Sequence, residues 1–86
     1  MAKEEITLFT KHSGKGDSVQ IPAKGYVRIE TSVPGNGNCH GMRYNEKRTS
    51  GVGFSIIPST PLSVKAGEWL VLRDSKNMER IYLEIR

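Results

Sequence analysis

The chain has 86 residues, which is enough to enclose one hydrophobic core and too few for two. Its single cysteine, Cys39, excludes an intramolecular disulfide and with it the class of small disulfide-rich secreted proteins. The formal net charge of +4 comes from 13 basic and 9 acidic side chains that are spread along the sequence, so anionic partners are favoured only through long-range attraction.

The first residues and the hydropathy both bear on location. Segment 1–5 lacks the basic start and the apolar stretch of a secretory signal, and the longest wholly apolar run, 69–72, is far too short to cross a bilayer. We therefore expect a protein that has no membrane partner and is made in the cytoplasm, a reducing compartment.

Alternation of apolar and polar residues with a period of two predicts the first two strands. Segment 6–10 has this pattern, and Val19 and Ile21 repeat it before Pro22 ends the pairing. The glycine-rich segment 13–17 between them is expected to be a hairpin loop.

The clearest alternation covers residues 26–33 and predicts the third strand, in which Val27, Ile29, Thr31 and Val33 share one face of the sheet. The segment that follows, 34–38, consists entirely of turn-forming residues.

Residues 34–38 contain Asn36-Gly37, which can supply the two positive φ angles of a type I′ hairpin turn. A return strand is then expected through Met42 and Tyr44. The polar segment 45–51 that follows it is expected to be an exposed loop.

The second half of the chain repeats the alternation, with strands expected over 52–56, 62–64, 68–73 and 81–86. The run 68–73 is apolar enough to be buried on both faces. Turn residues at 74–77 are expected to join the last two strands as a hairpin.

The fold class follows from these strands and from an absence of helical periodicity. No window places apolar residues at i, i+3, i+4 and i+7, and 9 glycines and 4 prolines are scattered along the chain. The sequence predicts a single all-β domain over residues 1–86. We expect a small antiparallel β-sandwich or barrel, jelly-roll-like or immunoglobulin-like, of about seven short strands.

Catalytic and metal sites are disfavoured by the spacing of the reactive residues. Cys39 and His40 are adjacent, so in a strand they point to opposite faces and the imidazole cannot activate the thiol. Adding His12 still gives none of the paired spacings of a zinc site, and the glycines of 34–41 lack the Gly-Lys-Ser/Thr of a phosphate loop. With no evident carboxylate pair, we expect no enzyme activity, no metal, no cofactor and no small-molecule substrate.

Segment 43–48 is basic and contains Tyr44, a combination that on a β-barrel can follow a phosphate backbone and stack a base. Binders of single-stranded nucleic acid present several aromatic residues on one sheet face, whereas several of the aromatic residues here are needed for a core. Nucleic-acid binding by a small β-barrel is therefore an alternative function.

Segment 61–72, with the sequence PLSVKAGEWLVL, resembles the strand and its preceding segment in small β-sandwich accessory domains of phage particles and tails. This resemblance implies a virion setting, as a protein that decorates or cements a capsid.

Three functions thus remain: a structural or accessory module of a larger assembly, a nucleic-acid-binding barrel, and a small phage-type inhibitor or adaptor that docks on one host protein. We expect the first, because a small domain gains stability by sharing surface with copies of itself or with a capsid or tail scaffold. The contacts are expected to come from the exposed loops 34–41 and 45–51. The candidate partner-binding residues are Asn36, Asn38, His40, Arg43, Tyr44, Lys47 and Arg48.

Overall fold

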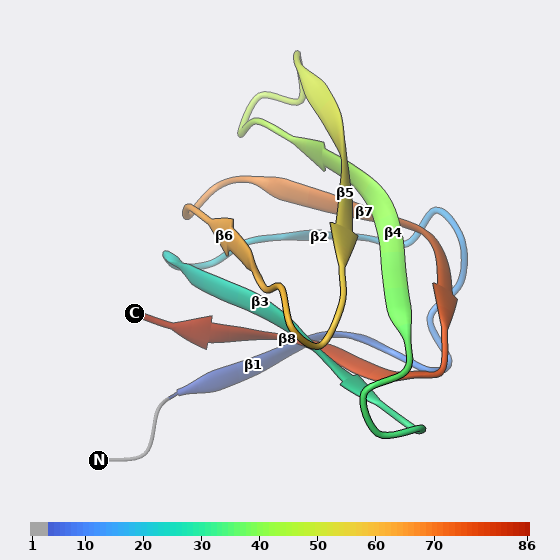
Figure 1. Cartoon of the computed structure of the whole chain (residues 1–86). Helices are drawn as coiled ribbons and strands as arrows, with labels where there is room; N and C mark the ends of the chain where they lie inside the picture. Colours follow the sequence, from blue (N-terminus) through green and yellow to red (C-terminus); the bar gives the residue numbers. More distant parts are fainter. Residues whose placement is uncertain (1–3) are drawn as a thin grey trace.

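Figure 1 shows the computed structural model, which describes residues 4–86; segment 1–3, on which part of the expectation about a secretory signal rests, lies outside the described residues. The described chain forms eight strands. In chain order they are β1 (Glu5–Thr10), β2 (Ser18–Gln20), β3 (Gly25–Thr31), β4 (Asn38–Tyr44), β5 (Gly51–Ile56), β6 (Leu62–Val64), β7 (Trp69–Lys76) and β8 (Met78–Ile85). Residues 4–86 contain no helix that is long and apolar enough to cross a membrane.

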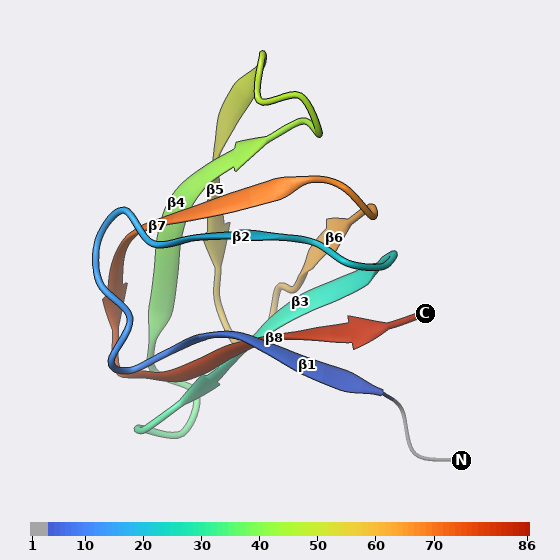
Figure 2. The same ribbon diagram turned by 180° about the vertical axis from the view of Figure 1, so that it is seen from behind.

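The strands form two four-stranded sheets with the orders β1-β8-β3-β6 and β2-β7-β4-β5, and every neighbouring pair is antiparallel. Strands therefore pair first with last, second with seventh, third with sixth and fourth with fifth. This order is that of a jelly roll. The prediction of a small all-β sandwich is confirmed, as a sandwich and not a closed barrel. Figure 2 shows β2 and β7 side by side in one sheet and β1 and β8 in the other.

The hairpins predicted at 13–17, 34–38 and 74–77 are wrong, because the strands on either side of each segment belong to different sheets. Only the connection between β4 and β5 joins two paired neighbours. The other connections cross from one sheet to the other, as the closing of a jelly roll requires.

The turn at 34–38 also differs in type. Gly35 has the positive φ, 69°, and the Asn36 N–H donates to the Val33 carbonyl over 3.0 Å, so Pro34-Gly35 occupies the centre of the turn as in type II. Neither Asn36 nor Gly37 has a positive φ. Gly37 is required for close approach instead, since a Cβ there would lie 2.6 Å from the Thr31 side chain.

The core lies between the sheets and is built from the alternating inward side chains, as the period of two predicts. Two expectations about faces need correction. Val33 is 44% exposed because β3 ends at Thr31, and the run 68–73 is fully buried only at Leu70 and Leu72. The buried apolar residues are Phe9, Ile21, Val27, Ile29, Cys39, Phe54, Ile56, Val64, Leu70, Leu72, Met78, Ile81 and Leu83.

Candidate interaction surface

The β4–β5 hairpin projects from one end of the sandwich (Figure 1, yellow-green). Its loop, 45–50, is exposed throughout, and the side chain of Asn45 holds it together. The Asn45 Oδ1 accepts hydrogen bonds from the N–H groups of Thr49 and Ser50 over 2.8 and 3.2 Å, and its Nδ2 donates to the Thr49 Oγ1 over 2.9 Å. Asparagine side chains stabilise turns in this way. The loop is thus ordered from within.

Trp69 of β7 fixes the same loop to the outer face of the sheet that contains β4 and β5. The indole Nε1–H of Trp69 donates to the Glu46 carbonyl over 3.2 Å. The Arg48 guanidinium lies 4.9 Å from the centre of the Trp69 ring and 5.5 Å from that of Tyr44, which stands directly across from Trp69 in the ladder. These contacts are cation–π interactions. They tie an exposed loop to the rigid sheet beneath it.

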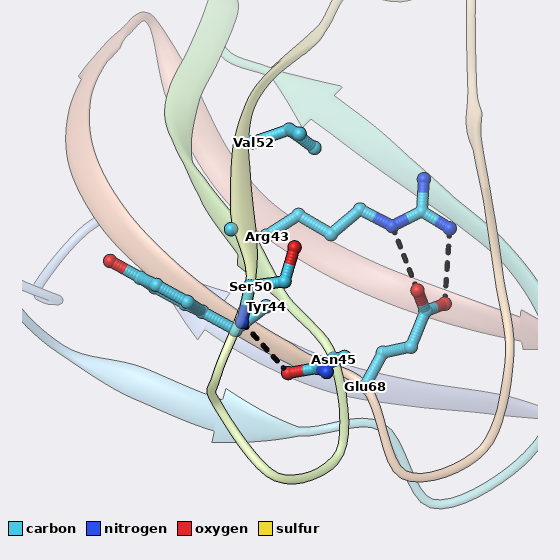
Figure 3. Close-up of a pocket in the computed structure, with 7 residues that line it drawn as sticks. Arg43, Tyr44, Asn45, Ser50, Val52 and Glu68 are labelled. Atoms are coloured by element: carbon cyan, nitrogen blue, oxygen red, sulfur yellow. Dashed lines mark hydrogen bonds and ion pairs between the residues drawn. The ribbon is translucent and has the colours of Figure 1, made fainter.

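Arg43 and Glu68 form a bidentate ion pair beside the hairpin (Figure 3), with the Arg43 Nε and Nη2 each 3.0 Å from a Glu68 carboxylate oxygen. The carboxylate also accepts the Lys65 N–H. Burial raises the pKa of Glu68, but the hydrogen bonds from Arg43 and Lys65 outweigh it and hold that pKa below its ordinary value. The Arg43 guanidinium is therefore already paired with a carboxylate of the same chain. The shallow pocket of about 170 Å³ beside this pair is lined in part by Asn45 and Val52.

The structure places most of the predicted contact residues at two opposite ends of β4. Tyr44, Lys47 and Arg48 lie at the hairpin end, whereas Asn36 lies beyond the other end of β4 and Asn38 begins that strand. A strand of this length spans roughly 23 Å. Loops 34–41 and 45–51 therefore do not form one continuous surface (Figure 1).

The two remaining predicted residues point to opposite sides of the sheet that contains β4. His40 lies on the exposed outer face, while Arg43 follows the inward parity of the buried Cys39. The prediction that Cys39 and His40 diverge is confirmed. Cys39 is 0% exposed, and burial, with a smaller contribution from Asp74, raises the pKa of its thiol to about 12.

An open depression of about 480 Å³ on the same outer face brings together Ser55, His40 and Asp74 from β5, β4 and β7. Ser55 and Asp74 each stand directly across from His40 in the ladders. The row has the order of a nucleophile, a base and an acid, but among the described residues no hydrogen bond joins the three, and all are exposed. Nothing in this geometry activates the serine hydroxyl.

The outer face of the other sheet differs, because its charges pair with one another. Arg80 contacts Glu5 and Glu30 at 2.9 and 3.0 Å, and the largely buried Glu84 lies between Arg28 and Arg86 at 3.6 and 3.0 Å. The hydrogen bonds that Arg80 donates to the carboxylates of Glu5 and Glu30 raise the pKa of Arg80. This face is a lattice of cross-strand ion pairs rather than a free basic patch.

Sequence reasoning missed the residues that organise the hairpin, which are Asn45, Glu68 and Trp69. Asn45 carries a usable signal, since asparagine opening a polar loop is typical of a turn. Glu68 and Trp69 carry none, because their partners lie more than twenty residues away along the chain.

Comparisons with protein families, with curated proteins and with solved structures gave no match for this chain. The class is therefore defined by the fold itself, an eight-stranded jelly-roll sandwich with an ordered hairpin at one end.

Proposed function

We propose that the protein is a non-enzymatic accessory module of a larger assembly and that it contacts a protein partner through the hairpin loop 45–50. The observation that carries the proposal is that every residue of this loop is exposed while Asn45, Arg48 and Trp69 hold it in one conformation. A loop ordered before binding loses little conformational entropy on association, and recognition loops on rigid scaffolds share this property.

The chemistry of the loop favours a polar protein surface. Glu46 and Lys47 are adjacent, exposed and of opposite charge, so the tip offers both an acceptor and a donor without a strong field of one sign. A virion scaffold is the setting that the resemblance over 61–72 implies. An inhibitor or adaptor that docks on one host protein would use the same loop.

Nucleic-acid binding has less support from the arrangement of the same residues. Arg43 is paired with Glu68, and Arg48 covers the ring faces of Tyr44 and Trp69 that a base would need for stacking. Within residues 4–86, Lys47 is the basic side chain of segment 43–48 that forms no ion pair or ring contact.

Photo-crosslinking in the cell that makes the protein tests the proposal. A benzophenone amino acid replaces Lys47 in one variant and Lys15, an exposed residue of the β1–β2 connection, in a control variant. We expect position 47 to give a discrete crosslinked protein, found in large particles, and position 15 to give none. A single partner outside particles would favour the adaptor function, and equal or absent crosslinking at both positions would contradict contact through the hairpin.

A further inference from the structure

Strand β5 is an edge strand without a charged side chain. It lies at the end of the sheet β2-β7-β4-β5, and the whole segment 49–64 around it carries no charge. Val52 is 60% exposed and Ile57 is 41% exposed, two of the large apolar residues that the surface leaves open. Natural edge strands are usually protected from pairing by charge, proline, bulges or shortness. β5 itself has none of these protections. The nearest proline, Pro58, lies outside the strand.

The other three edge strands have such protection. β2 and β6 are protected by shortness, with three residues each, and Pro61 directly precedes β6. β1 has a register irregularity between Thr7 and Phe9 and begins with a glutamate. Among the described strands, β5 is therefore the long, regular and uncharged edge.

The hydrogen-bonding groups on the free edge of β5 can be assigned from the ladder. The Asn45 N–H donates to the Ser50 carbonyl over 3.1 Å, which makes that pair a hydrogen-bonded one. By the alternation of an antiparallel ladder, the backbone groups of residues 52, 54 and 56 face β4. Those of Gly51, Gly53 and Ser55 face the free edge.

We propose that β5 pairs antiparallel with β5 of a second copy of this chain, about a twofold axis at Gly53. This register places Gly53 opposite the partner's Gly53 and Gly51 opposite the partner's Ser55, so every backbone group assigned to the free edge gains a partner. It also sets the exposed Val52 beside the partner's Phe54. The two sheets become one sheet of twice the width.

A second copy fits this edge better than a charged segment of another protein, for two reasons. A neutral edge pairs with itself without placing like charges opposite each other, although each chain carries a net charge of +4. A twofold contact is also self-complementary and closes, so it yields a dimer and not a fibre. The inference goes beyond the proposed function, because it concerns contact between copies and does not use loop 45–50.

The contact is expected to be weak, since pairing of two short strands buries less surface than a standard interface. Sedimentation equilibrium of the unmodified protein should show a monomer–dimer equilibrium at concentrations up to about 1 mM. Added salt should strengthen the association, because it screens the repulsion between two positively charged chains. A monomer throughout this range would overturn the proposal.

Disulfide trapping tests the register. A Cβ at Gly53 would meet only the Gly41 carbonyl at 3.9 Å, so Gly53→Cys fits the monomer. The symmetric register brings the two Cα atoms to roughly 5.5 Å, within the range of a disulfide. Gln20→Cys, on the exposed face of the opposite edge strand, is the control. The buried Cys39 is common to both variants and unreactive while folded.

Under mild oxidation Gly53→Cys should form a covalent dimer about tenfold faster than Gln20→Cys, because pairing holds its thiols together. Equal rates, or disulfides to an unrelated protein alone, would overturn self-pairing.

Exchange of charges at position 53 gives an independent test of the register. Gly53→Lys and Gly53→Asp should each weaken association about fivefold, and an equal mixture should restore it.

A mixture that associates no better than either variant would contradict the twofold axis at Gly53. Failure of this pairing is distinguishable from failure of the proposed function, because Gly53→Lys should weaken the dimer while the benzophenone amino acid at position 47 of the same chain still captures the partner.

Discussion

The guanidinium of Arg48 lies 4.9 Å from the centre of the Trp69 ring, and the indole N–H of the same tryptophan donates to the Glu46 carbonyl. One side chain of β7 thus holds the β4–β5 loop through its ring face and through its edge. Trp69 is also the single tryptophan of the chain, so its fluorescence reports directly on the state of this loop.

Replacement of Arg48 should separate the ring contact from the backbone strain at this position. Arg48 has a φ of 58°, which a non-glycine residue adopts at a cost. Arg48→Ala removes the cation–π contact and keeps that cost, so we expect a loss of about 1 kcal/mol in the free energy of unfolding. Arg48→Gly loses the same contact but relieves the backbone and should be near neutral. Urea denaturation followed by Trp69 fluorescence measures the free energy of unfolding of both variants. Equal losses would contradict a contribution of backbone strain at position 48.

The ion pair between Arg43 and Glu68 should make stability depend on pH in the acid range. The folded-state pKa of Glu68 lies below its ordinary value of 4.5, so the pair stabilises the fold above about pH 4.5. This contribution is lost as the pH falls through the folded-state pKa. We therefore expect Glu68→Gln to be less stable than the unmodified protein at neutral pH, with a difference that shrinks on acidification.

Thermal unfolding across the acid range measures this difference. Glu79→Gln is the control, because within residues 4–86 the Glu79 side chain forms only a long, exposed ion pair with Lys11 at 3.7 Å. Its replacement should change stability little at any pH. A gap between Glu68→Gln and the unmodified protein that stays constant on acidification would show that the carboxylate charge is not its source.

Gly41 and Gly53 should respond oppositely to alanine although both lie in the β4–β5 ladder. A Cβ at Gly41 would overlap the Val71 carbonyl oxygen and lie 2.8 Å from the Phe54 ring, neither of which can yield. We expect Gly41→Ala to cost roughly 3 kcal/mol or to prevent folding. Gly53→Ala meets ordinary contact and should change the free energy of unfolding by less than about 1 kcal/mol. Comparable losses in thermal unfolding would contradict the packing at Gly41.

The faces of the strands could be predicted from the sequence because each sheet has one buried and one open side. Val27 and Ile29, or Leu70 and Leu72, alternate with polar or half-buried neighbours and do face the core. The pairing of strands could not be predicted in the same way. Turn chemistry at 34–38 shows that the chain reverses, but not whether it reverses within one sheet or crosses to the other.

The site was predictable to a similar degree. Tyr44, Lys47 and Arg48 do lie together, because they are near one another in sequence and flank a single turn. Arg43 is four residues after Cys39 in the same strand, so the alternation of the strand places both on the inner face. The pairing of Arg43 with Glu68 was not predictable, since contacts between distant segments depend on the strand order.

The placement of β7 and β8 has a consequence for the order of folding. The last two strands occupy interior positions in both sheets, with β8 between β1 and β3 and β7 between β2 and β4. A chain that emerges from the ribosome therefore carries β1, β2 and β3 without their main neighbours until β7 and β8 have been made. Such contacts between distant residues slow folding and prolong exposure of unpaired strands. The molecule should thus assemble its sandwich in one late step, after synthesis of β8, rather than strand by strand.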